Sequence, residues 1–195
     1  MPIKKGRSGR IILELLHHPD GTLSKYRIAQ DTDTNISWVI TFLRRLEQKK
    51  IILKTRVLNI DQLIDEYLAL VPPPKTLNFF IRKPLEYLQK TKRLYALTTY
   101  AAENFTSYHL FLSRYDFYIK KNDLAQWTGE LFQEGLAGGG NFRLLIPSDE
   151  YIFKFIEKRK KLNLVSIPLL LIDLKREGGV CMEAYEYLVK KYVQR

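Results

Sequence analysis

Three consecutive prolines, at positions 72 to 74, limit how the 195-residue sequence can fold. Proline has a fixed φ and no backbone N–H donor, so a run of three cannot continue a helix and favours a stiff, extended spacer. A chain of this length can form two small domains. We therefore predict a first domain over residues 1–70, a proline-rich linker over residues 71–76 and a second domain over residues 77–195.

Positive charge is concentrated in the first part of the chain. Residues 1–58 contain twelve lysines and arginines and five acidic residues, a net charge of +7, whereas the other 137 residues have a net charge of only +4. Asymmetry of this kind is typical of proteins that bind a polyanion through their basic part. We therefore expect the first domain to contact nucleic acid.

Composition excludes several classes of protein. With 46% hydrophobic and 27% charged residues, the chain can bury a core, which argues against general disorder. Cys181 is the only cysteine, so neither an intrachain disulfide nor a multi-cysteine metal site can form. The apolar stretch after the basic N-terminus is too short for export, and no run approaches the roughly 20 apolar residues that span a bilayer. We expect a cytoplasmic protein with no membrane partner.

The first domain has the pattern of several helices followed by a short strand. Ser8 can cap a first helix, a second is expected at about residues 24–30 and a third at about residues 35–49. Residues 51–58 are apolar and β-branched, as in a short strand or hairpin, and Asp61 can open a fourth helix. This order predicts a winged helix-turn-helix.

The third helix carries the strongest candidate site. In a winged helix, exposed residues near the start of the reading helix meet base edges in the major groove, while cations farther along and on the wing meet phosphates. The apolar face is expected to comprise Ile36, Val39, Ile40, Leu43 and Leu46. The predicted base-edge contacts are Asn35, Ser37, Trp38 and Thr41, and the predicted phosphate contacts are Arg44, Arg45, Lys54 and Arg56.

Two alternatives apply to this surface. A basic helix face can be solvated without binding DNA, and Trp38 can pack on Phe42 four residues later. A further candidate contact is a basic N-terminal arm formed by Lys4, Lys5, Arg7 and Arg10.

The second domain mixes strands and helices. Strands are predicted at residues 77–81, 109–112, 115–119 and 142–146, and helices after Pro84 and at residues 95–104, 123–134, 168–177 and 181–192. This pattern predicts a mixed α/β domain for regulation or interaction, and an α+β protein overall. The glycine-rich stretch at residues 135–140 follows a helix and precedes a strand, the reverse of a phosphate-binding loop, so we predict a flexible turn there.

Signals for catalysis or metal binding are weak. His17 and His18 are adjacent and His109 has no spaced partner, so no metal site is predicted. Asp149 and the later Asp173-Leu174-Lys175 are similar to the acid and acid-x-Lys arrangement of metal-dependent nucleases. Pro168 predicts a helix there, which does not fit that geometry. We predict a protein that is not an enzyme and has no catalytic residue, metal or cofactor. The alternatives are a metal-dependent nuclease using the second domain and a protein-interaction module.

Segments of the second domain resemble a known family. They are Tyr95-Ala96-Leu97-Thr98 with Ala101-Ala102, the stretch from Gly139 through Asn141-Phe142-Arg143 to Pro147-Ser148-Asp149, Leu164-Val165-Ser166-Ile167-Pro168 with Ile172-Asp173-Leu174, and Gly178-Gly179 with Glu183-Ala184 and Leu188. Along most of its length the chain resembles the AbiE-type antitoxins of type IV toxin–antitoxin systems and their stand-alone transcriptional-regulator relatives. It departs from their pattern at Leu170, where a polar residue is expected, and in its short wing between Leu53 and Leu58.

The resemblance implies a fold and a function. It implies an antitoxin or repressor that binds operator DNA through an N-terminal winged helix and represses its own operon. The implied partners are double-stranded DNA and a nucleotidyltransferase-like toxin, which the C-terminal domain helps to neutralise. A homodimer would present two reading helices to half-sites about one helical turn apart.

Overall fold

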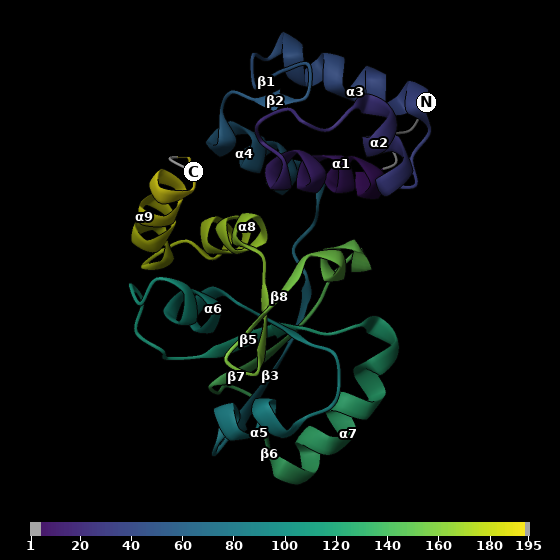
Figure 1. The fold of residues 1–195 in the computed structure, drawn as a ribbon. Coiled ribbons are helices and arrows are strands. Elements are labelled where there is room, and N and C mark those ends of the chain that lie inside the picture. The colour runs from purple at the N-terminus through teal and green to yellow at the C-terminus, as the bar shows by residue number, and fades with distance from the viewer. Residues whose placement is uncertain (1–4, 194–195) are drawn as a thin grey trace. The chain divides into compact units, whose positions relative to one another are not determined.

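The computed structural model describes residues 5–193 and is a mixed α/β protein, about 54% helical and 18% strand. The chain divides into two compact units, Met1–Pro72 together with Val189–Arg195, and Pro73–Leu188 (Figure 1). This division falls within the proline run. The predicted linker over residues 71–76 extends too far. Lys75 and Thr76 already belong to a strand, where they pair with Ile146 and Leu145. The predicted second domain also extended through residue 195, whereas Val189–Arg195 group with the first unit.

The described part of the first unit contains four helices and a small hairpin in the expected order, together with the last residues of α9 (Cys181–Val193). The four helices and the hairpin strands are α1 (Lys5–His17), α2 (Lys25–Asp31), α3 (Ile36–Gln48), β1 (Ile52–Leu53), β2 (Arg56–Val57) and α4 (Ile60–Leu70). Side-chain oxygens cap three of the helices, from Ser24, Asn35 and Asn59. Apolar residues at helical spacing form the core, including Ile12, Leu16, Ile28, Leu43, Leu46 and Leu63.

The turn between α1 and α2 fixes the position of the hairpin. The Val57 amide donates to the Pro19 carbonyl at 2.9 Å, and the Thr55 hydroxyl donates to the Gly21 carbonyl at 3.1 Å. Gly21 has a φ of +83°, and a Cβ there would lie 3.0 Å from the backbone nitrogen of Arg56. Only glycine suits both the backbone and the close approach. The hairpin is therefore held against the helices on which α3 packs.

The second unit is built on a seven-stranded sheet (Figure 1). Its strands are β3 (Lys75–Ile81), β4 (Ala96–Thr98), β5 (Tyr115–Tyr118), β6 (Gly135–Ala137), β7 (Phe142–Ile146), β8 (Ile156–Arg159) and β9 (Leu162–Val165), in the order β6-β3-β7-β5-β4-β9-β8. The helices are α5 (Pro84–Lys90), α6 (Thr99–Thr106), α7 (Leu124–Glu134), α8 (Ile167–Glu177) and α9 (Cys181–Val193), with 3-10 turns at Lys121–Asp123 and Glu150–Phe155. The pairs β5–β7 and β4–β9 are parallel, and the others are antiparallel.

Successive side chains of the central strand β5 point to opposite faces of the sheet. Phe117 faces Trp127 of α7, with ring centroids 5.3 Å apart. Its neighbours Asp116 and Tyr118 point to the opposite face, where the Tyr118 hydroxyl donates to Asp173 of α8. Figure 1 shows α5 and α7 on one side of the sheet and α6 and α8 on the other. One face thus has an aromatic core and the other carries buried charges.

Several local predictions for this unit were wrong. The predicted helix over residues 95–104 begins only at Thr99, because Ala96–Thr98 form the buried strand β4. The predicted strand at residues 109–112 is a loop, and the predicted turn at residues 135–140 begins with β6, which pairs with β3. A short apolar run buried on both sides cannot be distinguished from a helix by its periodicity. No described helix is both long and apolar enough to cross a membrane.

Candidate nucleic-acid interface

Helix α3 is positioned by its cap and by one buried face. The Asn35 side-chain oxygen accepts from the Ser37 amide at 2.8 Å and caps the helix. The buried residues are Val39, Phe42, Leu43 and Leu46. Ile36 was predicted to pack in the core but is 37% exposed, because the buried face is centred nearer Phe42. The face opposite the core is therefore exposed to solvent.

The polar residues predicted to read bases begin α3. Asn35, Ser37 and Thr41 are exposed. Thr41 donates its hydroxyl to the Ser37 carbonyl at 2.9 Å, so its oxygen remains available as an acceptor and its methyl group as an apolar contact. The 13-residue helix is roughly 20 Å long and has a diameter suited to the major groove.

Trp38 does not fit the predicted base-edge role as well as its neighbours. The residue is half-buried, and its indole N–H is buried with no acceptor among the described residues. An indole reads base edges only through that donor. The structure thus places Trp38 between the core and the surface of the unit, and the N–H does not reach the exposed face.

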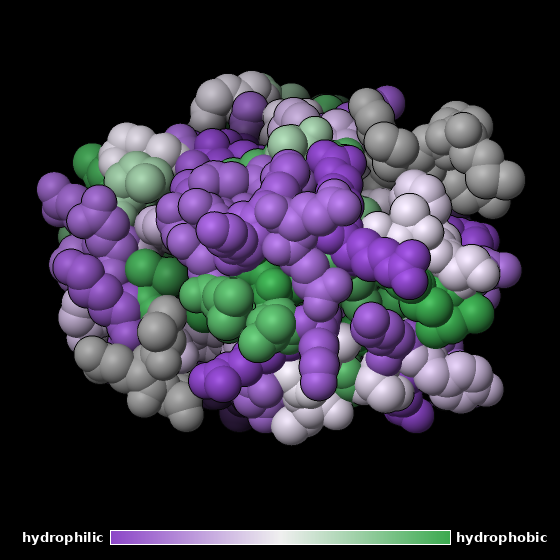
Figure 2. All heavy atoms as spheres, turned by 90° about the horizontal axis from the view of Figure 1, so that it is seen from above, coloured by the Kyte–Doolittle hydropathy of each residue, from purple (hydrophilic) through white to green (hydrophobic). Residues whose placement is uncertain are grey.

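The predicted phosphate contacts form an exposed basic surface. Arg44, Arg45, Lys54 and Arg56 are all exposed. Arg45 is partly neutralised, because its guanidinium lies 3.6 Å from Glu66 of α4, which also pairs with Lys49. Arg44, Lys54 and Arg56 have no ion-pair partner within the described part of the chain. Figure 2 looks onto this side of the first unit, where hydrophilic side chains form a broad group.

Two lysines of this surface occupy backbone positions that favour glycine. Lys50 ends α3 with a φ of +57°, and Lys54 begins the two-residue hairpin turn with a φ of +60°. A left-handed conformation destabilises a non-glycine residue by roughly 1–2 kcal/mol. Glycine or asparagine is preferred at both kinds of position. The sequence therefore retains cations here at a small loss of stability, as expected for functional sites.

The substitution Lys54→Gly separates these two effects. We expect the free energy of unfolding to rise by about 0.5–1 kcal/mol, because relief of the strained φ exceeds the entropy lost by glycine. Affinity for duplex DNA is expected to fall about eightfold at about 0.1 M salt, because one phosphate contact is lost. Urea denaturation and fluorescence anisotropy measure the two quantities. Unchanged affinity in a folded variant would remove Lys54 from the interface.

Sequence reasoning missed one exposed residue beside this surface. The sequence makes Tyr26, Ile28 and Ala29 of α2 all available to the core, but Tyr26 is 65% exposed, and its hydroxyl accepts from Gln30 at 3.3 Å. Helix α2 has only seven residues, and Ile28 and Ala29 are its buried positions. A polar partner at i+4 was the available signal that Tyr26 faces solvent. In helix-turn-helix proteins the helix before the reading helix crosses the DNA backbone.

The predicted basic arm is only partly described. Lys4 and the side chain of Lys5 lie outside the described residues. Arg7 pairs with Asp33 at 3.9 Å, and Arg10 donates to the Thr32 carbonyl at 3.4 Å. These two arginines therefore contact the turn between α2 and α3.

The residues of the nuclease alternative belong to two separate elements and make structural contacts. Asp173 and Lys175 lie on α8, and Asp149 caps a 3-10 turn by accepting from the Tyr151 amide at 3.0 Å. The Asp173 carboxylate accepts from the hydroxyls of Thr98 at 2.6 Å and Tyr118 at 2.8 Å. Within residues 5–193, no three His, Cys, Asp or Glu residues are placed to share a metal ion.

Asp173 makes the stability of the second unit depend on pH. Burial raises the pKa of its carboxyl to about 6, against the opposing hydrogen bonds from Thr98 and Tyr118. Because the folded pKa exceeds the ordinary value of 3.8, the stabilising effect is complete below about pH 4 and is lost as the pH rises through 6. Asp173→Asn is therefore expected to raise the free energy of unfolding by about 1–3 kcal/mol at pH 7.5 and by much less at pH 4.5. Urea denaturation at both pH values tests this, and an equal change at both would contradict it.

A buried charge cluster lies on the same face of the sheet. Asp116 of β5 is completely buried and accepts two hydrogen bonds each from Arg114 and Arg143, at 2.7–3.0 Å. Both arginines also donate to Glu177 of α8. Burial alone would raise the pKa of Glu177, but the hydrogen bonds from Arg143 and Arg114 outweigh burial and hold this pKa below its usual range. Two cations and two anions thus neutralise one another and fix α8 on the sheet.

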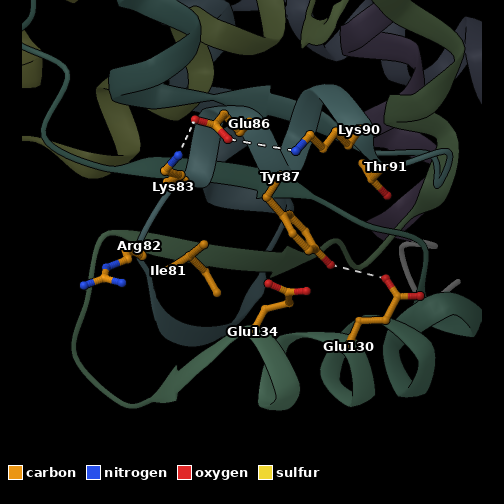
Figure 3. A pocket seen from close by; sticks show the side chains of 9 residues that line it. All are labelled: Ile81, Arg82, Lys83, Glu86, Tyr87, Lys90, Thr91, Glu130 and Glu134. Carbon is orange, nitrogen blue, oxygen red and sulfur yellow. Dashed lines mark hydrogen bonds and ion pairs between the residues drawn. The ribbon is translucent and has the colours of Figure 1, made fainter.

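A hollow in the second unit is polar, and its charged groups pair with one another (Figure 3). Its volume is about 540 Å³, and it is lined by Ile81, Arg82, Lys83, Glu86, Tyr87, Lys90, Thr91, Glu130 and Glu134. Glu86 pairs with Lys83 and Lys90, and the Tyr87 hydroxyl donates to Glu130 at 3.2 Å. Burial and the Glu130 charge raise the pKa of Tyr87, which keeps its proton for this bond. The Tyr87–Glu130 bond joins α5 to α7.

Comparison with protein-family models, with curated proteins and with solved structures finds no match for this chain.

Proposed function

We propose that this chain is a sequence-specific, DNA-binding transcriptional regulator whose first unit acts as a winged helix-turn-helix. In this proposal α3 is the reading helix and the β1–β2 hairpin is the wing. The main supporting observation is charge: residues 35–58 contain six lysines and arginines and one acidic residue. Within this segment, the side chains of Arg44, Lys54 and Arg56 are exposed and form no ion pair among the described residues.

The proposed mode of binding follows from the geometry of α3. Its start would enter the major groove, with the Asn35 amide, Ser37 and Thr41 near base edges. Arg44 and the hairpin cations Lys54 and Arg56 would contact phosphates, which fix the register of the protein on the duplex. Trp38 would support the helix from beneath, since its N–H is buried. Sequence preference is thus assigned to the first turns of α3 and affinity to the cations.

The second unit is proposed to serve regulation, partner binding or self-association. The resemblance to AbiE-type antitoxins favours an autoregulating repressor with a nucleotidyltransferase-like toxin as partner. The proposal requires no catalytic residue, metal or cofactor. A homodimer would match a pseudo-palindromic operator with half-sites about one helical turn apart.

Binding to the DNA immediately upstream of the protein's own gene tests the proposal. The full chain is titrated into this duplex and into a scrambled duplex of the same composition, over a salt series with magnesium present. We expect tighter binding to the upstream duplex, weakening as salt rises, with the DNA left intact. Equal affinity for both duplexes, or no binding at low salt, would contradict the proposal. Cleavage of the DNA would favour the nuclease alternative.

A further inference from the structure

The β8–β9 hairpin of the second unit ends in an unusually basic turn. Arg159 pairs with Leu162, so Lys160 and Lys161 alone form the loop. Their φ values are +47° and +66°, as in a type I′ turn, which favours Asn-Gly because both central residues are left-handed. Lys158, Lys160 and Lys161 are exposed, whereas Arg159 pairs with Glu157 at 2.7 Å. Three exposed cations therefore lie at this end of the hairpin, and two of them, Lys160 and Lys161, occupy a backbone conformation that lysine does not favour.

An exposed tyrosine contacts this turn, and an exposed phenylalanine follows three residues later in the same loop. The loop between α6 and β5 carries Tyr108, which is 67% exposed, and Phe111, which is 85% exposed. Tyr108 also has a positive φ, of +59°. The Lys160 ammonium donates to the Tyr108 hydroxyl at 3.1 Å, which joins the loop to the hairpin. The basic-aromatic platform is the set Tyr108, His109, Phe111, Tyr187, Lys158, Lys160 and Lys161.

Ring stacking within the platform shows how a further ring could bind. His109 and Tyr187 of α9 are stacked, with centroids 5.3 Å apart and planes 13° apart. The exposed face of Phe111 is free for the same kind of contact, since the ring is almost fully in solvent. Proteins bind unpaired nucleic acid with solvent-exposed aromatic rings and nearby cations, because bases stack on the rings and phosphates contact the cations. Duplex DNA keeps its base faces stacked inside, and an acidic peptide offers charge without such faces.

We infer that the basic-aromatic platform binds single-stranded nucleic acid. This site is separate from the duplex interface proposed for α3 and uses different residues. Lysines 158, 160 and 161 would contact successive phosphates, and Tyr108 and Phe111 would stack on unpaired bases.

The test uses the full chain and two fluorescent probes of about 20 nucleotides, oligo(dT) and oligo(rU), which cannot pair with themselves. The main variant is Lys160→Asn with Lys161→Gly, which introduces the sequence that the turn prefers. Its thermal stability is expected to equal or exceed that of the parent protein. Affinity for both probes is expected to fall about 25-fold at about 0.1 M salt, because two phosphate contacts are lost. A more stable protein that binds less tightly excludes misfolding as the cause.

Stacking is tested separately with Phe111→Ala. We expect at least a fivefold loss of affinity for oligo(rU). Phe132→Ala, which removes another exposed phenylalanine of the same unit, is the matched control and should leave binding unchanged. The duplex-interface variant Arg44→Ala/Arg56→Ala should keep its affinity for oligo(rU). The inference would be overturned if this duplex-interface variant lost affinity for oligo(rU) while the variant Lys160→Asn with Lys161→Gly kept its affinity.

Two further outcomes would also overturn it. One is the absence of oligonucleotide binding at low salt, where phosphate contacts are strongest. The other is competition by polyglutamate as effective as by oligo(rU), which would assign the platform to an acidic protein partner. Failure of this inference leaves the duplex-binding proposal intact, because that proposal concerns Arg44, Lys54 and Arg56.

Discussion

The double substitution Arg44→Ala/Arg56→Ala is expected to weaken binding to the upstream duplex about 60-fold at about 0.1 M salt. Each phosphate contact contributes a slope of about 0.9 to the dependence of affinity on salt, which is roughly eightfold at this concentration. Arg44 and Arg56 are exposed and have no acidic partner among the described residues, so their removal does not disturb an ion pair. Anisotropy titrations with the full chain measure the loss.

The control for this prediction removes the same charge elsewhere. Lys92 and Lys121 are exposed lysines of the second unit outside the basic-aromatic platform. Lys92→Ala/Lys121→Ala should therefore bind the duplex almost as tightly as the parent chain. An equal loss in both double variants would indicate a general effect of net charge and would contradict the assignment of α3 and the hairpin. Loss for the upstream and scrambled duplexes alike is expected, because phosphates carry no sequence information.

The largest loss of stability is expected from Asp116→Asn. This residue is completely buried and is the shared acceptor of Arg114 and Arg143, and it also accepts from the Thr99 hydroxyl. Without its charge, two partly buried guanidinium groups retain Glu177 as their one acidic partner among the described residues. Breaking a buried ion cluster in this way lowers the free energy of unfolding by about 3–5 kcal/mol, a large part of a domain's total of about 5–15 kcal/mol.

Urea denaturation followed by Trp127 fluorescence measures this loss. Trp127 is buried against Phe117 in the second unit, and Trp38→Phe removes the only other tryptophan. Glu177→Gln is the comparison, and its loss should be smaller because the side chain is 24% exposed. A loss below about 1 kcal/mol for Asp116→Asn would show that the cluster does not hold α8 on the sheet.

Local features of the first unit could be predicted from the sequence. Asn35 and the helical period after it define α3 through interactions within a few residues, whereas α4 begins at Ile60 and is capped by Asn59 and not by the predicted Asp61. The surface side chains Ser37, Thr41, Arg44 and Arg56 also lie on the exposed face as expected. The burial of three residues was not predicted correctly: Ile36 and Tyr26 are exposed, and the indole N–H of Trp38 is buried. Helical spacing gives the direction of the buried face but not its width.

The second unit was less predictable because its contacts are distant in sequence. Asp116 meets Arg143 only through the parallel pairing of β5 with β7, and Asp173 meets Thr98 across 75 residues. No pattern of neighbouring residues reports such pairing. Hairpin β8–β9 was missed because its turn contains two lysines in place of the usual Asn-Gly signal. The same two lysines, Lys160 and Lys161, belong to the basic-aromatic platform.

Site-directed cleavage of DNA from α3 tests the central claim most directly. The native thiol Cys181 is buried, so Thr41→Cys supplies an exposed thiol for an iron–EDTA reagent, with the labelled parent chain as background. We predict cuts confined to a few nucleotides on each strand of the upstream duplex, where the major groove receives α3. Ser113→Cys, on an exposed loop of the second unit, is the control and should not give this pattern. Absence of localised cuts from position 41, or the same cuts from position 113, would contradict the account of α3 as the reading helix.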